Sequence, residues 1–364
     1  MKAIKALTCI LALALLLATA VFTSAGDAWA EKKVINLKIG MAKPIQAGKA
    51  FSIVKEIFQA EVSRRVAAET PYEVKWTEAF GGTVAKDGEV LEAVQMGLLD
   101  IGYVIYLFEP AKLFLHNFGY FVPFSSSDQV MVNEITGRLF DEFPVMRSVF
   151  ETQYGQKMLC NLTASSYQLI TTFPVNSIAD LKGKKIAAGG PNLIVVKPLG
   201  AVPVQSSIGE GYTSFKMGVY QGWIILESIM AGLKWPEVAP YVTVIDLGSP
   251  PAAALTMNLR SLEKLPPEVR AIVLQAGKHL AVAGPKTVQA FDEKIRGFLA
   301  KSGAKVSRLP QAQRLKWADA LPEVAKLKAK EADKRGLPGT ALIKRYIQMQ
   351  QEAGYVFPRN WQVD

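Results

Sequence analysis

The sequence predicts an α/β protein of two domains, and three observations lead to that class. Strand-like and helix-like segments alternate along the chain, which is the pattern of sheets covered by helices. Two such series occur, one within residues 34–106 and one within residues 158–248. Even without its first 30 residues, the chain is long enough for two domains that each have a core.

The N-terminal segment has the features of a secretory signal peptide. Lys2 and Lys5 precede an apolar run, and Ala28-Trp29-Ala30 supplies the small-x-small pattern that signal peptidase cleaves. We therefore expect residues 1–30 to be removed and the mature protein to be periplasmic. An uncleaved anchor is the alternative, which the shortness of the apolar run disfavours. Cys9 precedes most of that run, so no lipid attachment is expected.

The first series predicts a parallel sheet. Its segments read in turn as strand, helix, strand, helix and strand, over residues 34–42, 51–70, 72–80, 89–97 and 99–106. A βαβαβ order is typical of parallel strands that are joined by covering helices.

The second series predicts another α/β domain that faces the first. Its segments cover residues 158–172, 184–190, 210–218, 222–232 and 241–248. Within it, the stretch from Ala187 to Gly190 has almost no side chain, which usually means that another group comes close to the backbone. After cleavage the only cysteine is Cys160, so the fold has to be held by packing and not by an internal disulfide.

The charge distribution does not indicate a nucleic-acid site. The formal net charge of +10 is scattered through amphipathic stretches such as residues 323–336, a pattern typical of solvated helix faces. Because we expect the protein to be exported, nucleic acid is not an expected partner.

No catalytic constellation is found. His116 and His279 lie in apolar contexts typical of packing or surface residues, and no HExxH, GxSxG, P-loop or CxxC motif occurs. Glu210 and Glu227 could form a carboxylate pair, but their sequence separation does not determine their distance. We expect no enzyme activity, no metal and no cofactor, and interpret the protein as one that captures a solute.

Four segments then carry a specific resemblance, and their order and spacing agree over nearly the whole mature chain. They are similar to the DctP-type solute receptors of tripartite ATP-independent periplasmic (TRAP) transporters, and they cover residues 81–104, 176–186, 199–222 and 258–277. The resemblance implies a two-lobed, hinged periplasmic-binding-protein fold that closes on a small molecule. It also implies delivery to a membrane permease with a small and a large subunit, and we expect the receptor to be a monomer.

The family's connectivity implies how the chain divides. One lobe is expected to contain residues 31–164 and 253–292, and the other residues 165–252 and 293–364 with the C-terminal helices. A long helix from Pro266 onward is expected to bridge both lobes.

Positions that carry charge or polarity in many family members are apolar or small in this chain. The arginine that usually binds a substrate carboxylate corresponds to Ala187, and a second arginine of some acidic-sugar receptors corresponds to Tyr167. Trp223 and Ile225 stand where a polar residue often follows a turn, and Ile208 replaces a frequent aromatic. These departures predict an uncharged or largely apolar ligand with an aromatic or branched hydrocarbon body.

Other candidate ligand contacts follow from loop position. Ligands of open α/β sheets bind beyond the carboxyl ends of the strands, where we expect residues 41–43, 80–82, 103–106, 167 and 187–190. Phe80, Tyr106 and Gly189 are among them. Tyr212 and Asn258 match family residues near the cleft.

Three alternatives stay open at this point. A lysine such as Lys43, Lys49 or Lys197, or backbone amides, could anchor an organic acid in place of the arginine. A receptor of the same fold could serve a sensor kinase and not a permease. An enzyme or lipid carrier built on this fold is the third alternative, and it would need acid-base residues or a larger cavity.

Overall fold

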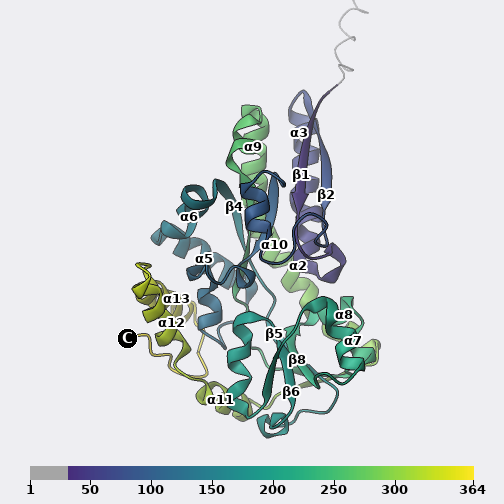
Figure 1. Cartoon of the computed structure of the whole chain (residues 1–364), viewed down its shortest axis with the longest axis vertical. Coiled ribbons are helices and arrows are strands. Elements are labelled where there is room, and N and C mark those ends of the chain that lie inside the picture. Colours follow the sequence, from purple (N-terminus) through teal and green to yellow (C-terminus); the bar gives the residue numbers. More distant parts are fainter. Residues whose placement is uncertain (1–31) are drawn as a thin grey trace, which may run out of the picture.

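The computed structural model describes residues 32–364, and the predicted signal peptide lies outside them. Two β-sheets, each covered by helices, are stacked along the long axis of the molecule (Figure 1). Over the described residues, no helix combines the length and the apolar character that a membrane crossing requires. The α/β class and the arrangement in two halves agree with the sequence prediction.

The first sheet has five strands in the order β2-β1-β3-β10-β4. As predicted, β1 runs parallel to both β2 and β3. The late strand β10 enters between β3 and β4 and is antiparallel to both, which makes the sheet mixed and not purely parallel. The strands are β1 Lys33–Gly40, β2 Tyr72–Ala79, β3 Ile101–Ile105, β4 Gln156–Thr163 and β10 Pro251–Asn258.

The helix that was predicted over residues 51–70 is broken into consecutive segments. An α-helical turn leads into a π-helical stretch, η3, and then into a regular helix, α3.

Helix α5 begins at Asp128, whose carboxylate accepts a hydrogen bond of 3.0 Å from the Met131 amide. The helical segments of this half are η2 Ile45–Ala47, α2 Lys49–Ile53, η3 Val54–Gln59, α3 Ala60–Glu69, α4 Val90–Gln95, η4 Tyr106–Phe108, η5 Leu115–Phe121, α5 Gln129–Glu142, α6 Val145–Tyr154 and α9 Leu259–Lys264.

The second sheet has six strands in the order β11-β9-β5-β8-β6-β7. Strand β5 is antiparallel to both of its neighbours, whereas β6 is parallel to β7 and β8. The strands are β5 Tyr167–Thr171, β6 Lys185–Ala188, β7 Val202–Gln205, β8 Gly222–Leu226, β9 Tyr241–Val244 and β11 Lys305–Arg308, and the helical segments are η6 Ile178–Leu181, η7 Gly190–Val195, η8 Lys197–Leu199, η9 Ile208–Glu210, α7 Gly211–Lys216, α8 Glu227–Gly232 and η10 Trp235–Glu237.

The chain passes between the two sheets at two adjacent places. Residues 158–172, which are one segment of the second series in the sequence, form the end of β4 in one sheet and β5 in the other. The return passage leads from β9 to β10. The two passages are hydrogen-bonded, because the Ala164 amide donates to the Pro250 carbonyl at 3.0 Å and the Tyr167 amide to the Gly248 carbonyl at 3.3 Å. Such paired connections are typical of a hinge.

The helix α10, Pro267–Lys301, is 35 residues long and contacts both halves, as predicted. It packs against β4 and α5 of the first half and against α8 and β11 of the second. A Cβ at Gly277 would lie 2.8 Å from the Leu159 carbonyl oxygen, so glycine permits the close approach of α10 to β4.

The C-terminal helices do not stay with the second sheet. Helix α11, Gln311–Ala320, contacts η8 of the second half, but α12, Val324–Lys334, contacts η5 and α13, Gly339–Glu352, contacts α5 (Figure 1). The expected lobe boundaries assign all of residues 293–364 to the second lobe, whereas these last two helices pack on the first half.

Candidate functional site

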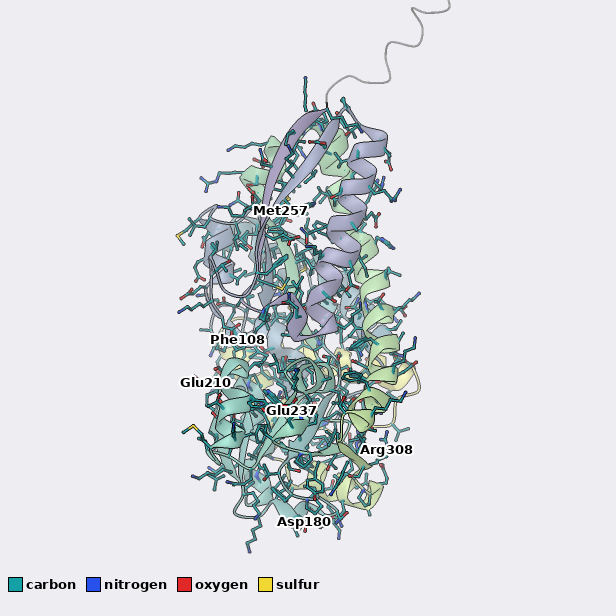
Figure 2. The ribbon with its side chains drawn as sticks, turned by 90° about the vertical axis from the view of Figure 1, so that its right-hand side faces the viewer. Phe108, Asp180, Glu210, Glu237, Met257 and Arg308 are labelled. Atoms are coloured by element: carbon teal, nitrogen blue, oxygen red, sulfur yellow. The ribbon has the colours of Figure 1, made fainter. Side chains whose placement is uncertain are left out.

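A cavity of about 440 Å³ lies between the two halves. It is located where β3 and β4 of the first sheet and β6 and β8 of the second end, the edge at which α/β proteins bind ligands. Figure 2 shows Phe108 of the first half and Glu210 of the second on either side of this junction. The lining includes Lys43, Phe51, Asp87, Tyr103, Phe108, Tyr120, Tyr167, Gly189, Asn192, Ile208, Glu210, Trp223, Ile225 and Leu226.

Aromatic side chains from both halves meet in the cavity. The rings of Phe51 and Tyr103 pack edge to face with centroids 6.0 Å apart. The hydroxyl groups of Tyr120, from η5, and Tyr167, from β5, lie 3.1 Å apart and join the two halves. Burial raises the pKa of Tyr103, Tyr120 and Tyr167, so all three present neutral hydroxyl groups.

Trp223 is the neighbour of Ala187, one of the two small residues on β6. Trp223 is paired in register with Ala187 of the parallel neighbour β6, so both side chains leave the same face of the sheet. Ala187 has no exposed surface and does not line the cavity, whereas Trp223 does. Within this stretch, Trp223 of the adjacent strand is thus the neighbour of Ala187, whereas Gly190 faces Leu107.

Trp223 is held in place by other aromatic residues. Its ring centroid lies 4.7 Å from that of Trp235 and 5.3 Å from that of Tyr220. Its side chain is 1% exposed, and its Nε1 has no hydrogen-bond partner within residues 32–364. A buried donor without a partner costs about 1–3 kcal/mol, so a bound acceptor would stabilise this arrangement.

The cavity contains one positive charge, which is already paired. Lys43 is 7% exposed and forms an ion pair with Asp87, and its Nζ lies 4.7 Å from the centroid of the Phe108 ring. Asp87 lines the cavity as well, and the exposed Glu210 lies at its edge. No arginine of the described chain is among the lining residues, so the acidic groups outnumber the basic one.

Five of the ten predicted ligand contacts line this cavity: Tyr167, Gly189, Ile208, Trp223 and Ile225. The remaining five do not. Besides Ala187, they are Phe80, Tyr106, Tyr212 and Asn258.

Most of these other residues have structural partners. The Tyr106 hydroxyl donates to Asn161 Oδ1 at 3.0 Å, and the Tyr212 hydroxyl donates to Glu237 at 2.9 Å. Asn258 is the N-cap of α9, and its Nδ2 donates to the Val94 carbonyl at 2.7 Å. Phe80 is half-buried against the core.

The other lysines that could anchor an acid lie elsewhere. Lys49 forms an ion pair with Glu56 outside the cavity, and Lys197 is exposed and does not line it. Of the three lysines considered from the sequence, only Lys43 lines the cavity.

The titratable groups considered for catalysis are dispersed. Glu227 is buried away from the cavity, where its carboxylate accepts a 2.8 Å hydrogen bond from Arg296, so it does not form a pair with Glu210. Burial lowers the pKa of His116 to about 4, and its Nε2 lies 2.7 Å from the Met146 carbonyl oxygen. His279 contacts Glu61 on the surface. Within residues 32–364, no group of three or more His, Cys, Asp or Glu side chains is arranged to hold a metal.

Phe51, Asp87, Tyr120 and Asn192 line the cavity but were not predicted from the sequence. Tyr103 was expected near the cleft, because it lies toward the carboxyl end of a predicted strand, and it lines the cavity. Tyr120 and Asn192 belong to the 3-10 helical segments η5 and η7, whose course has no periodic signal in the sequence.

Comparison with solved structures identifies the fold. The chain is similar to a marine metagenome TRAP solute-binding protein specific for aromatic acids, in complex with 3-hydroxybenzoate, with a TM-score of 0.76 and 21% identity over 88% of this chain and 99% of that one. A TRAP solute-binding protein from Rhodoferax ferrireducens with copurified benzoate gives a TM-score of 0.75 and 16% identity over 88% and 98%. The receptor DctP7 of Bordetella pertussis, which binds pyroglutamic acid, gives 0.69 and 22% over 86% and 99%.

Sequence comparison gives a partial match to curated proteins and a broad match to one family. The uncharacterized protein YiiZ of Salmonella typhimurium is 28% identical over 224 residues, which are 60% of this chain and 66% of that protein. A solute-binding protein of a Sulfitobacter species is 29% identical over 118 residues, 32% of this chain and 36% of that one. The model of bacterial extracellular solute-binding protein family 7, DctP, matches residues 55–331. The chain therefore belongs to this DctP family of substrate-binding receptors and has the two-lobed fold of TRAP periplasmic solute-binding proteins.

Proposed function

We propose that this protein is the periplasmic receptor of a TRAP transporter for a small, uncharged and largely apolar solute. The observation that carries the proposal is the lining of the interlobe cavity. Six aromatic side chains contribute to it, and its single lysine is paired with Asp87. The ligand would be delivered to a two-subunit membrane permease.

The free energy of binding favours burial of an apolar group over burial of a carboxylate in this cavity. Burial of about 200 Å² of apolar ligand surface would contribute roughly 5 kcal/mol at 25 cal/mol per Å². A carboxylate in the same space would lose its hydration beside Asp87 and Glu210, with no arginine to receive it.

Hydrogen bonds in the cavity suit a neutral polar group. The hydroxyl groups of Tyr103 and Tyr167 can donate or accept, and Trp223 Nε1 can only donate. A ligand with an aromatic or branched body and one hydroxyl, carbonyl or ether oxygen would satisfy these groups.

We further propose that the lobes close by bending at the two chain passages. Residues 165–252 would move as part of the second lobe, because the adjacent passages are the natural hinge. The pair of Tyr120 and Tyr167 would then report on the closed state, since its members come from different halves.

An aromatic acid held by Lys43 is the second candidate. It is favoured by the position of Lys43 in the cavity and by the bound 3-hydroxybenzoate and benzoate of two solved relatives. The ion pair with Asp87 argues against it, because that carboxylate already neutralises the lysine.

Calorimetric titration with neutral and anionic derivatives of the same ring separates the two candidates. Benzyl alcohol and 3-methylphenol are compared with benzoate and 3-hydroxybenzoate, at pH 7.5. The apolar proposal predicts that each neutral compound binds at least about tenfold more tightly, or about 1.4 kcal/mol.

Variants then test the anchor. Lys43→Met combined with Asp87→Asn removes both charges and should leave the neutral compounds bound, and Lys49→Met serves as a control outside the cavity. Tighter binding of the acids, lost in the double variant and kept in the control, would establish the second candidate and contradict the first.

A further inference from the structure

A second cavity, of about 380 Å³, adjoins the ligand cavity. Its walls come from η4 and η5 of the first half, η7 of the second half and the C-terminal helix α12. Leu107 and Tyr120 line both cavities, and the consecutive residues Gly189 and Gly190 line one each. The two spaces are therefore separated by a wall one side chain thick.

Leu107 is the movable part of this wall. Tyr120 is buried and its hydroxyl is engaged with Tyr167, whereas Leu107 is only half-buried. Gly190, at φ +48°, brings its backbone against Leu107, because a Cβ there would lie 3.5 Å from both Leu107 Cδ1 and the Leu107 carbonyl oxygen. A change of the Leu107 side chain from one staggered rotamer to another would connect the cavities. Such a change needs no movement of the backbone.

The second cavity is largely apolar. The rings of Phe114 and Phe121 lie 5.3 Å apart, and Leu193, Ile194 and Val324 complete much of the surface. Lys328 Nζ lies over both rings, 5.5 and 6.0 Å from their centroids, and is paired with Glu331 at 2.7 Å. Glu331 also pairs with Arg335, whose guanidinium carbon lies 4.0 Å from the centroid of the Phe114 ring, so one carboxylate is shared by two cations at the edge of a largely apolar space.

One residue that lines this cavity has a buried polar atom without a partner. Asn117 is 2% exposed, and its Nδ2 donates to the carbonyl oxygens of Tyr106 at 3.0 Å and Leu113 at 3.1 Å. These two bonds determine which end of the amide is the nitrogen. Its Oδ1 is buried and accepts no hydrogen bond from the described part of the chain. Such an acceptor needs a donor, because a buried polar atom without one is destabilising.

We propose that the ligand is elongated and occupies both cavities. Its aromatic or branched body lies in the first cavity, and an apolar arm passes Leu107 and ends in a hydroxyl or N–H group that donates to Asn117 Oδ1. This inference rests on the proposed apolar-ligand function and adds a length and a terminal group to it.

A graded series of phenols tests the length. The probes are 4-methylphenol, 4-alkylphenols of increasing chain length, and the matching phenols with a terminal hydroxyl on the chain. Affinity should rise by about fourfold for each methylene that enters the second cavity. At one chain length the terminal hydroxyl should add roughly three- to tenfold over the plain alkyl chain.

A filling variant locates the arm. Ile194→Trp places an indole in the second cavity, and Val202→Trp, on the exposed strand β7, is the matched control. Ile194→Trp should bind the long phenols no better than it binds 4-methylphenol. Its affinity for 4-methylphenol should equal that of the wild-type protein. Val202→Trp should bind every phenol as the wild-type protein does.

The outcomes separate the two proposals. Binding of 4-methylphenol without a gain from chain length, or a gain that survives in Ile194→Trp, would overturn the elongated ligand and leave the proposed function standing. No binding of any phenol by the wild-type protein would overturn both.

Discussion

Replacing Ala187 by arginine tests why this cavity lacks the family's usual anchor. Ala187 is fully buried on β6, with Val204 and Trp223 as its neighbours in register. An arginine there would have to displace the Trp223 indole and would bring a charge into an apolar environment. Of the two acids that line the cavity, Asp87 is already paired with Lys43, and Glu210 is exposed.

The expected cost can be divided into size and charge. Overpacking of a core position costs about 1–3 kcal/mol, and a buried charge without a partner raises the total to roughly 3–5 kcal/mol. Ala187→Met adds an unbranched chain without charge, so it measures the first contribution alone. We expect the arginine variant to be less stable than the methionine variant by about 2 kcal/mol.

Urea unfolding of both variants, with and without benzoate, measures this difference. A carboxylate would supply the missing partner, and at a hundred times its dissociation constant it would restore about 2.7 kcal/mol to the arginine variant only. Equal stability of the two variants, with equal responses to benzoate, would show that position 187 does not decide whether a charge is accepted.

Three further predictions concern other parts of the fold. Burial raises the pKa of Asp292 to about 6, so its contribution to stability is present at low pH and is lost as the pH rises from about 4 through 6. Asp292→Asn keeps an oxygen that can accept the hydrogen bond from Gln129, so it should flatten urea stability over that range and gain about 2 kcal/mol at pH 7.5; an unchanged pH profile would contradict this. Gly277→Ala should destabilise the protein by about 1–3 kcal/mol in the same assay, because its Cβ would press on the Leu159 carbonyl, and unchanged stability would refute this contact. Burial raises the pKa of the Cys160 thiol to about 12, so little reactive thiolate is present at pH 8. N-ethylmaleimide should therefore modify Cys160 slowly in the native protein and quickly in urea. Rapid modification of the native protein would contradict the buried position.

Elements with strong local patterns could be predicted from the sequence. The three strands expected before residue 107 all exist as β1, β2 and β3, because alternation and apolar runs are local properties. The long helix α10 was implied by the family resemblance. Asn258 was interpreted as a ligand contact, although an asparagine directly before a helix is itself a capping signal.

Relations between distant segments could not be predicted in this way. Nothing local in residues 158–172 indicates that the chain changes sheets between β4 and β5, and the boundary expected at residues 164/165 came from the family resemblance alone. The pairing of Ala187 with Trp223 depends on the register of two strands that are separated by 33 residues, from 189 to 221. Five of the ten residues that we expected to contact the ligand do not line the cavity. The direction of their side chains depends on tertiary packing, which the local sequence does not reveal.

The most direct test of the account is the identity of the molecule that the protein carries when it is purified without added ligand. Native mass spectrometry would give the mass of the bound species, and chromatography of the denatured sample would give its charge and chemical class. We predict a neutral, largely apolar compound with an aromatic or branched body, which remains bound when Lys43→Met and Asp87→Asn are combined. A carboxylic acid that is lost in that double variant and retained in Lys49→Met would contradict it.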